Sequence, residues 1–144
     1  MQEEQRKICG KKRGSMENIK VLIFVESRYK VNRKRINSFV LSLLKEQGVK
    51  GPAEVSIAIV GDRKMRALHK KYKREDKTTN VLSFSLADGE ASMMPSNTLR
   101  LGDVVVSYPQ VIKEAAKEEV MVDDKVEELV NHGVMHLLGI HHEE

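Results

Sequence analysis

The chain is poor in the residues that mark several common classes of protein. Its 144 residues include one cysteine, Cys9, and no tryptophan, and aromatic residues make up 4% of the total. A single cysteine excludes an intramolecular disulfide framework and any zinc site built from several cysteines, and it is compatible with a reducing compartment. No run approaches the ~20 apolar residues that a membrane-spanning helix needs, and the first residues lack the apolar core of a signal peptide. We therefore expect a soluble cytoplasmic protein with no membrane partner.

The length and the hydrophobic content suit one domain with one core. Hydrophobic residues make up 40% of the chain, and domains most often contain about 100 to 150 residues. Residues 1–15 are polar and rich in glycine, lysine and arginine, which predicts a basic flexible leader before a single domain over residues 16–144.

Hydrophobic periodicity predicts an α+β fold. We expect strands at 19–25, 54–60, 81–86 and 99–107. We expect helices between Asn32 and Gly48, from Asp62 as a cap, from Pro109 to about Val120, and after Asp123 or Asp124 as a cap. Strands and helices in this mixed order predict a small mixed four-stranded sheet packed with helices.

Four of the five histidines lie in one segment near the carboxyl end, from His132 to His142. His132 and His136 are four residues apart, so on a helix their rings lie on one face and can bind one ion. Gly139 allows the chain to turn back after the helix, which would bring His142 towards the same face. This spacing predicts a metal site at the end of the C-terminal helix, with a fourth position left for water as in a catalytic zinc site.

The third ligand and the metal are less closely specified by the sequence. His142 has the expected offset, while His141 could be a supporting partner or an exposed neighbour. Three imidazoles suit Zn²⁺ best, one ion per chain, although nickel, copper or iron would also bind such a set. His69 is expected to be an exposed helical residue rather than a ligand.

The histidine spacing equals that of the metzincin proteases, with one difference. Those enzymes have a glutamate after the first histidine, and it takes a proton from the metal-bound water. Gly133 occupies that position here. Without the glutamate, peptide cleavage is disfavoured.

The segment His132-Gly133-Val134-Met135-His136-Leu137-Leu138-Gly139-Ile140-His141-His142 resembles the signature of the YbeY family, together with the segments 79–84 and 101–106. The resemblance covers roughly residues 53–142. It implies an rRNA maturation factor, a metal-dependent endoribonuclease that acts on single-stranded RNA and works with the small ribosomal subunit or its proteins. The same resemblance places a functionally important arginine before the strand at 81–86, where this chain has Lys73 followed by Arg74. Other departures are Asn80 for aspartate, Ser85 for proline and His141 for aspartate.

Charge is unevenly distributed along the chain, although the net charge is only +4. Acidic residues dominate the final third, whereas one predicted helix and its exit carry Arg63, Lys64, Arg66, Lys70, Lys71, Lys73, Arg74 and Lys77. Such a helix is often only a solvated face, but beside a metal motif it is suited to hold RNA phosphates. With so few aromatic residues, backbone contacts should dominate, giving weak sequence specificity and no preference for DNA.

These observations predict a mechanism and leave its general base open. Zn²⁺ on His132, His136 and His142 would make its water acidic enough to react at neutral pH, and Lys73 or Arg74 would hold the scissile phosphate. Asp103 and Glu90 are both candidates for the base. The alternatives are an RNA-binding ribosome-assembly factor whose metal is mainly structural, and a hydrolase of small molecules or peptides.

Overall fold

The fold is a four-stranded mixed sheet with helices on both faces. The computed structural model describes residues 18–73, 79–85 and 98–139. The elements follow in the order β1 (Ile19–Val25), α1 (Arg33–Glu46), β2 (Ala53–Val60), α2 (Asp62–Lys73), β3 (Val81–Ser85), β4 (Leu99–Ser107), α3 (Tyr108–Glu118) and α4 (Val122–Leu137). The strand order is β1-β2-β4-β3, with β3 antiparallel to β4 and the other pairs parallel. The expected α+β fold is confirmed.

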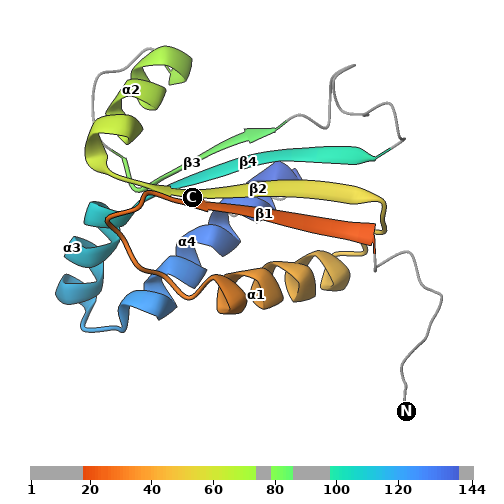
Figure 1. Cartoon of the computed structure of the whole chain (residues 1–144), viewed down its shortest axis with the longest axis horizontal. Coiled ribbons are helices and arrows are strands. Elements are labelled where there is room, and N and C mark those ends of the chain that lie inside the picture. Colours follow the sequence, from red (N-terminus) through yellow and green to blue (C-terminus); the bar gives the residue numbers. More distant parts are fainter. Residues whose placement is uncertain (1–17, 74–78, 86–97, 140–144) are drawn as a thin grey trace.

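One face of the sheet is covered by α1, α3 and α4, which lie below it in Figure 1. The main core lies between these helices and the sheet, and its fully buried side chains include Leu44, Ile57, Ile59, Val104 and Val130. Alternate residues of β2 are buried on this face, as expected for a strand with one side in the core. This arrangement presses α4 against β3 and β4.

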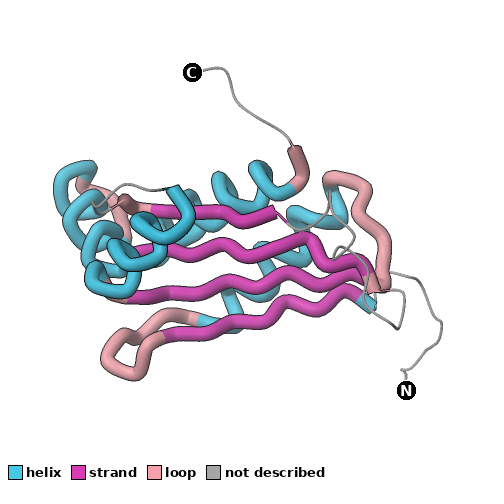
Figure 2. The backbone as a smooth tube through the Cα atoms, turned by 90° about the horizontal axis from the view of Figure 1, so that it is seen from above, coloured by secondary structure: helices cyan, strands magenta, loops and turns pink. Residues whose placement is uncertain are grey.

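The opposite face is covered by α2 over only one end. A smaller cluster of Val60, Met65, Leu82 and Val105 joins α2 to the sheet. Among the described elements, no other helix lies on this face, and the strands are visible beyond α2 in Figure 2. Leu22 and Phe24 of β1 therefore remain exposed, at 46% and 58% of their surface.

Two helix starts differ from the expected caps. Asp62 does not precede α2, because Met65 N donates to Gly61 O and the helix begins at Asp62. The Asp62 carboxylate instead accepts hydrogen bonds from Ser107 and Gln110, at the start of α3. The predicted cap of α4 at Asp123 or Asp124 is also wrong, because Met121 is the cap and offers no side-chain hydrogen bond.

Asp123 and Asp124 lie in the first turn of α4, where negative charge stabilises a helix dipole. There they pair with Arg35 of α1, whose terminal nitrogen lies 2.6 Å from Asp124 Oδ1. The guanidinium also donates to Glu127. Hydrogen bonds to Glu127 and Asp124 hold the pKa of Arg35 above its ordinary value. The ion pairs tie α1 to the start of the helix that carries the histidines.

Candidate functional site

The helix α4 carries His132 and His136 on the side that faces away from the core. Its buried residues, among them Leu129, Val130 and Val134, form a stripe at helical spacing against the sheet. His132 is exposed and His136 is half-buried. The two ring centroids are 5.0 Å apart, and the rings are inclined by 42°. The predicted placement of these two side chains on one helical face is therefore observed.

This separation fits two ligands of one tetrahedral ion. A zinc–nitrogen bond is about 2.0–2.1 Å long, so two imidazoles at a tetrahedral angle have ring centroids about 5 Å apart. Neither ring would have to leave its face of the helix. The pair is thus suited to hold one divalent ion, with neutral nitrogens as the donors that zinc prefers.

The helix ends as the sequence predicts. Gly139 has a φ of +79°, and its N–H donates to the carbonyl of His136. A left-handed residue at this place reverses the chain, and glycine adopts it without strain. His141 and His142 lie outside the described residues. Within the described ranges, no three His, Cys, Asp or Glu side chains are grouped closely enough to hold a metal, so a site on this pair needs a ligand from elsewhere.

Gly133 has a packing role that the sequence comparison with proteases did not suggest. A Cβ atom at this position would lie 2.5 Å from Cγ1 of Val104, which is fully buried in β4. The absence of a side chain lets α4 approach the sheet. A glutamate here would point into Val104 rather than towards His132 and His136, so the metzincin arrangement does not fit this helix.

A second glycine brings β3 close to the same region. The pairing of β2 with β4 shifts register after Glu54, and Gly102 in the irregular stretch has a φ of +139°. A Cβ on Gly102 would meet the carbonyl oxygen of Phe84 at 2.2 Å and Leu137 Cδ2 at 2.9 Å. The end of α4 therefore packs directly on this irregular stretch, which fixes the histidine face beside the edge strand β3.

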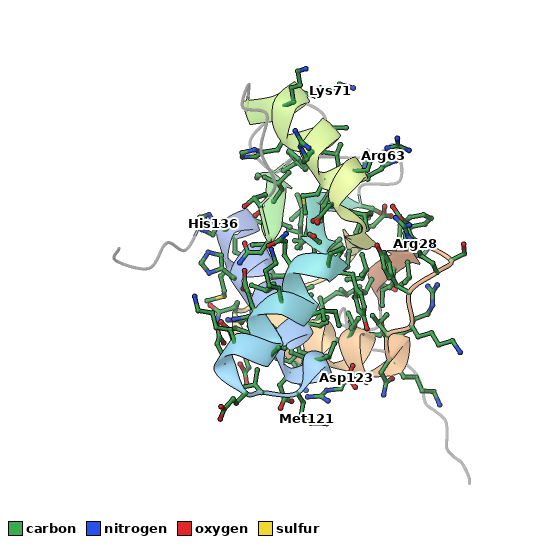
Figure 3. All side chains as sticks on the ribbon, turned by 90° about the vertical axis from the view of Figure 1, so that its left-hand side faces the viewer. Arg28, Arg63, Lys71, Met121, Asp123 and His136 are labelled. Carbon is green, nitrogen blue, oxygen red and sulfur yellow. The ribbon has the colours of Figure 1, made fainter. Side chains whose placement is uncertain are left out.

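The predicted basic helix is present as α2. Its cationic side chains are exposed and are borne by Arg63, Lys64, Arg66, Lys70 and Lys71. Figure 3 shows Arg63 and Lys71 on α2 and His136 on α4, with the sheet between the two helices. Lys73 is the last residue of α2, but its side chain lies outside the described part, as do Arg74 and Lys77. Their proposed contacts with a phosphate stay predictions.

Two expectations about single residues change. His69 was expected to be exposed, but only 6% of it is accessible, because it lies on the side of α2 that packs inward. Asp103 points to the α2 face of the sheet, since Val104, the next residue of the strand, faces α4. This placement disfavours Asp103 as a base at the histidine pair. Glu90 lies outside the described residues.

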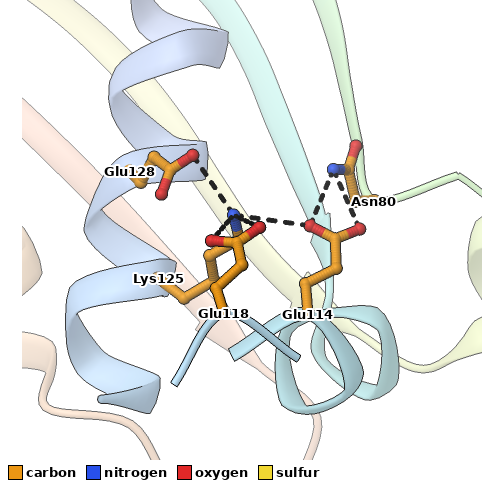
Figure 4. A network of polar contacts seen from close by, with 5 residues as sticks. All are labelled: Asn80, Glu114, Glu118, Lys125 and Glu128. Carbon is orange, nitrogen blue, oxygen red and sulfur yellow. Dashed lines mark hydrogen bonds and ion pairs between the residues drawn. The ribbon is translucent and has the colours of Figure 1, made fainter. Parts of the chain in front are cut away.

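A buried lysine that the sequence pattern did not single out joins three elements (Figure 4). Lys125 Nζ lies 3.0 Å from both carboxylate oxygens of Glu118 and 3.2 Å from Glu128. It also lies 3.6 Å from Glu114, which accepts hydrogen bonds from Asn80 at the start of β3. Burial lowers the pKa of Lys125, but hydrogen bonds to Glu118 and Glu128 outweigh it, and the net shift is upward. A lysine inside the apolar stripe of α4 was the signal available in the sequence.

The departure at Asn80 is explained by the same network. Its amide nitrogen lies 3.2 Å and 3.3 Å from the two oxygens of Glu114. An aspartate at this place would set two carboxylates against each other, whereas asparagine donates to Glu114. The replacement therefore suits this chain, whose α3 presents a glutamate to β3.

Comparisons with known proteins identify relatives of this chain. The chain is 42% identical over 94 residues to the Endoribonuclease YbeY of Rhodospirillum rubrum, covering 65% of this chain and 47% of that one. It is 32% identical over 120 residues to the Endoribonuclease YbeY of Acinetobacter baumannii, covering 83% and 76%. A third relative, the Endoribonuclease YbeY of Magnetococcus marinus, is 36% identical over 97 residues and is covered over 66% of its length.

A solved structure has the same fold. The solution structure of a Thermotoga maritima protein superposes with a TM-score of 0.59 at 21% sequence identity, covering 85% of this chain and 75% of the other. The chain spans about half to two thirds of the first two relatives, at 47% and 66%. The family model described as Endoribonuclease YbeY matches residues 22–144, and the chain therefore belongs to the YbeY family.

Proposed function

We propose that this protein is a metal-dependent endoribonuclease that hydrolyses single-stranded RNA during rRNA maturation and ribosome assembly or quality control. The observation that carries the proposal is the pair of imidazoles on α4, with centroids 5.0 Å apart and a left-handed glycine at the end of the helix. The relatives named Endoribonuclease YbeY support the same activity.

One Zn²⁺ ion per chain is proposed, held by His132 and His136 with His142 as the third ligand, or His141 in its place. When bound, such an ion supplies Lewis acidity and a nucleophile at neutral pH. The fold of this chain positions the two histidines, because the packing of Gly133 on Val104 sets the distance of α4 from the sheet.

The basic helix is proposed to bind the RNA backbone. Cations on α2 would neutralise phosphates of the substrate, and Lys73 or Arg74 would hold the phosphate that is cut. A lysine binds phosphate as a point charge, whereas arginine can donate two parallel hydrogen bonds. We expect single-stranded rRNA as substrate, the small ribosomal subunit or its proteins as partners, no specificity for DNA, and a cytoplasmic location. No helix in the described ranges has the length and apolar character that crossing a membrane requires.

The direct test is cleavage of a labelled single-stranded RNA by purified protein. Wild type should cut it in the presence of Zn²⁺, should stop after chelation, and should recover when the metal returns. His136→Ala should lose at least ~100-fold in rate, because a metal ligand is removed. Asn131→Ala is the matched control, since Asn131 lies on the same helix but faces a groove with Asp124 and Glu127.

Equal cleavage by wild type and His136→Ala would contradict the proposal. RNA binding without any metal-dependent cleavage would favour the alternative, an assembly factor whose metal is mainly structural.

A further inference from the structure

The face of the sheet that α2 partly covers contains a cavity of about 350 Å³ that the proposed chemistry does not use. Leu68 of α2 forms one wall, and Ser56, Ala58, Phe84 and Asp103 of the sheet contribute to the rest of the lining. It lies on the opposite side of the sheet from α4. It is therefore separate from the histidine pair.

The strand register places three chemically different groups in one row. Ser56 pairs with Asp103, and Asp103 pairs with Phe84, across β2, β4 and β3. Directly paired side chains on one face are about 4.5–5.5 Å apart at Cβ. A carboxylate thus lies between a hydroxyl and an aromatic ring, in a cavity whose other walls are apolar.

The Asp103 carboxylate has acceptor capacity to offer a ligand. Within the ranges 18–73, 79–85 and 98–139, no side chain forms an ion pair or hydrogen bond with it. Asp103 is half-buried, so its oxygens are reachable from solvent. A ligand with N–H donors and an apolar body would complement both the charge and the walls.

Two of the three phenylalanines lie on this face. Phe39 packs against the main core, whereas Phe84 lines the cavity and Phe24 is exposed on β1. Exposed aromatic rings on a four-stranded sheet provide stacking surfaces for the bases of single-stranded RNA.

Cations lie immediately beyond the wall of the cavity. Leu68 faces it, and the adjacent residue Ala67 belongs to a groove in which three cations, Arg63, Arg66 and Lys70, accompany one carboxylate, Asp62. A single strand whose phosphates lie in that groove could place a base across α2 into the cavity. In such an arrangement the phosphate contacts position the RNA, and the base contact recognises its sequence.

We propose that the cavity binds one base of single-stranded RNA, stacked on Phe84, with Asp103 accepting hydrogen bonds from its amino group. This inference rests on the proposed function. Adenine, cytosine and guanine each present an amino donor, and guanine adds the neighbouring ring N–H. Uracil has no amino group, and its single ring N–H donor, at N3, lies between two carbonyl oxygens that the carboxylate would repel. The site therefore selects amino-bearing bases against uracil.

The test compares base preference in wild type and Asp103→Asn. Dissociation constants for labelled octamers of adenine, cytosine and uracil are measured by fluorescence anisotropy at low temperature, beside their cleavage rates. Wild type should bind the adenine and cytosine octamers about five- to tenfold more tightly than the uracil octamer. Asp103→Asn should reduce this ratio to about one, because the amide can also donate to uracil carbonyls.

Two further variants separate recognition from charge and folding. Glu46→Gln, which removes an exposed carboxylate from α1, should leave the ratio unchanged. Phe84→Leu should weaken all octamers by at least about threefold, because stacking is lost, and should keep the ratio. Circular dichroism confirms that each variant is folded.

An unchanged ratio in folded Asp103→Asn, with RNA still cut by wild type, overturns this inference alone. Failure of wild type to bind or cut any octamer overturns the proposed function as well.

Discussion

Replacing Gly133 by alanine should loosen the helix that carries the histidines. The new methyl group would lie 2.5 Å from Val104 Cγ1, 3.1 Å from Cγ2 and 3.3 Å from Cβ. Val104 is branched at Cβ and fully buried, so it cannot swing aside as the end of a long side chain would. Either α4 lifts from β4 or the strand shifts, and such overpacking costs about 1–3 kcal/mol.

Alanine also favours the helix by about 1 kcal/mol relative to glycine, which offsets part of that cost. A contact this short belongs in the upper half of the overpacking range, so the net loss in the free energy of unfolding should be about 1–2 kcal/mol. Urea denaturation followed by circular dichroism at 25 °C measures it. The midpoint should fall with little change in the slope.

A double-mutant cycle with Val104→Ala identifies the cause. Removing the Val104 methyl groups makes room for the new one, so the double variant should be at least about 1 kcal/mol more stable than the sum of the single effects predicts. Gly139→Ala is the matched control. Its Cβ would meet nothing within 4 Å, and its cost comes from its φ of +79°, so it should not couple to Val104. A Gly133→Ala variant as stable as wild type, or uncoupled from Val104→Ala, would refute the packing argument.

Three further predictions concern stability and binding. The pKa of Lys125 is raised, so its contribution to stability is present below the unfolded pKa of 10.5 and is lost as pH rises through the higher folded pKa. Lys125→Met should destabilise the protein by roughly 2 kcal/mol at pH 7 and should flatten the loss of stability above pH 10.5. An unchanged loss of stability at alkaline pH in urea titrations would argue against this. Glu119 ends α3 with a φ of +59°, so Glu119→Gly should raise the free energy of unfolding by about 0.5–1 kcal/mol in thermal melts, and a loss would show that the left-handed turn is not strained. Affinity for single-stranded RNA should fall steeply with salt, and Arg66→Ala should reduce the slope of log K against log salt by about 0.7, whereas an unaltered slope would remove α2 from the interface.

The fold could be predicted from local patterns because its elements are strongly periodic. The alternation along β2 and the apolar stripe of α1 specify their faces without reference to the rest of the chain. The predicted caps of α2 and α4 were wrong because tertiary contacts engage these carboxylates. Asp62 and Asp124 are acceptors by type, but their partners are Gln110 and Arg35, which are distant in the sequence.

The candidate site could be predicted in part for a similar reason. The positions of His132 and His136 on one face follow from helical geometry alone, and so does the turn at Gly139. The burial of His69 and the orientation of Asp103 depend on which face of each element meets the sheet. The spacing of residues along the sequence does not say which face of an element meets the sheet. The packing of Gly133 on Val104 likewise joins residues that only the folded chain brings together.

The metal content of the purified protein tests the central claim most directly. Elemental analysis of wild type and Asn131→Ala should find about one divalent ion per chain, and His132→Ala and His136→Ala should lose it. His142→Ala should lose it too if His142 is the third ligand, whereas loss in His141→Ala with metal retained in His142→Ala would assign that role to His141. A full complement of metal in folded His136→Ala would contradict the account, because the paired imidazoles on α4 would then not hold the ion.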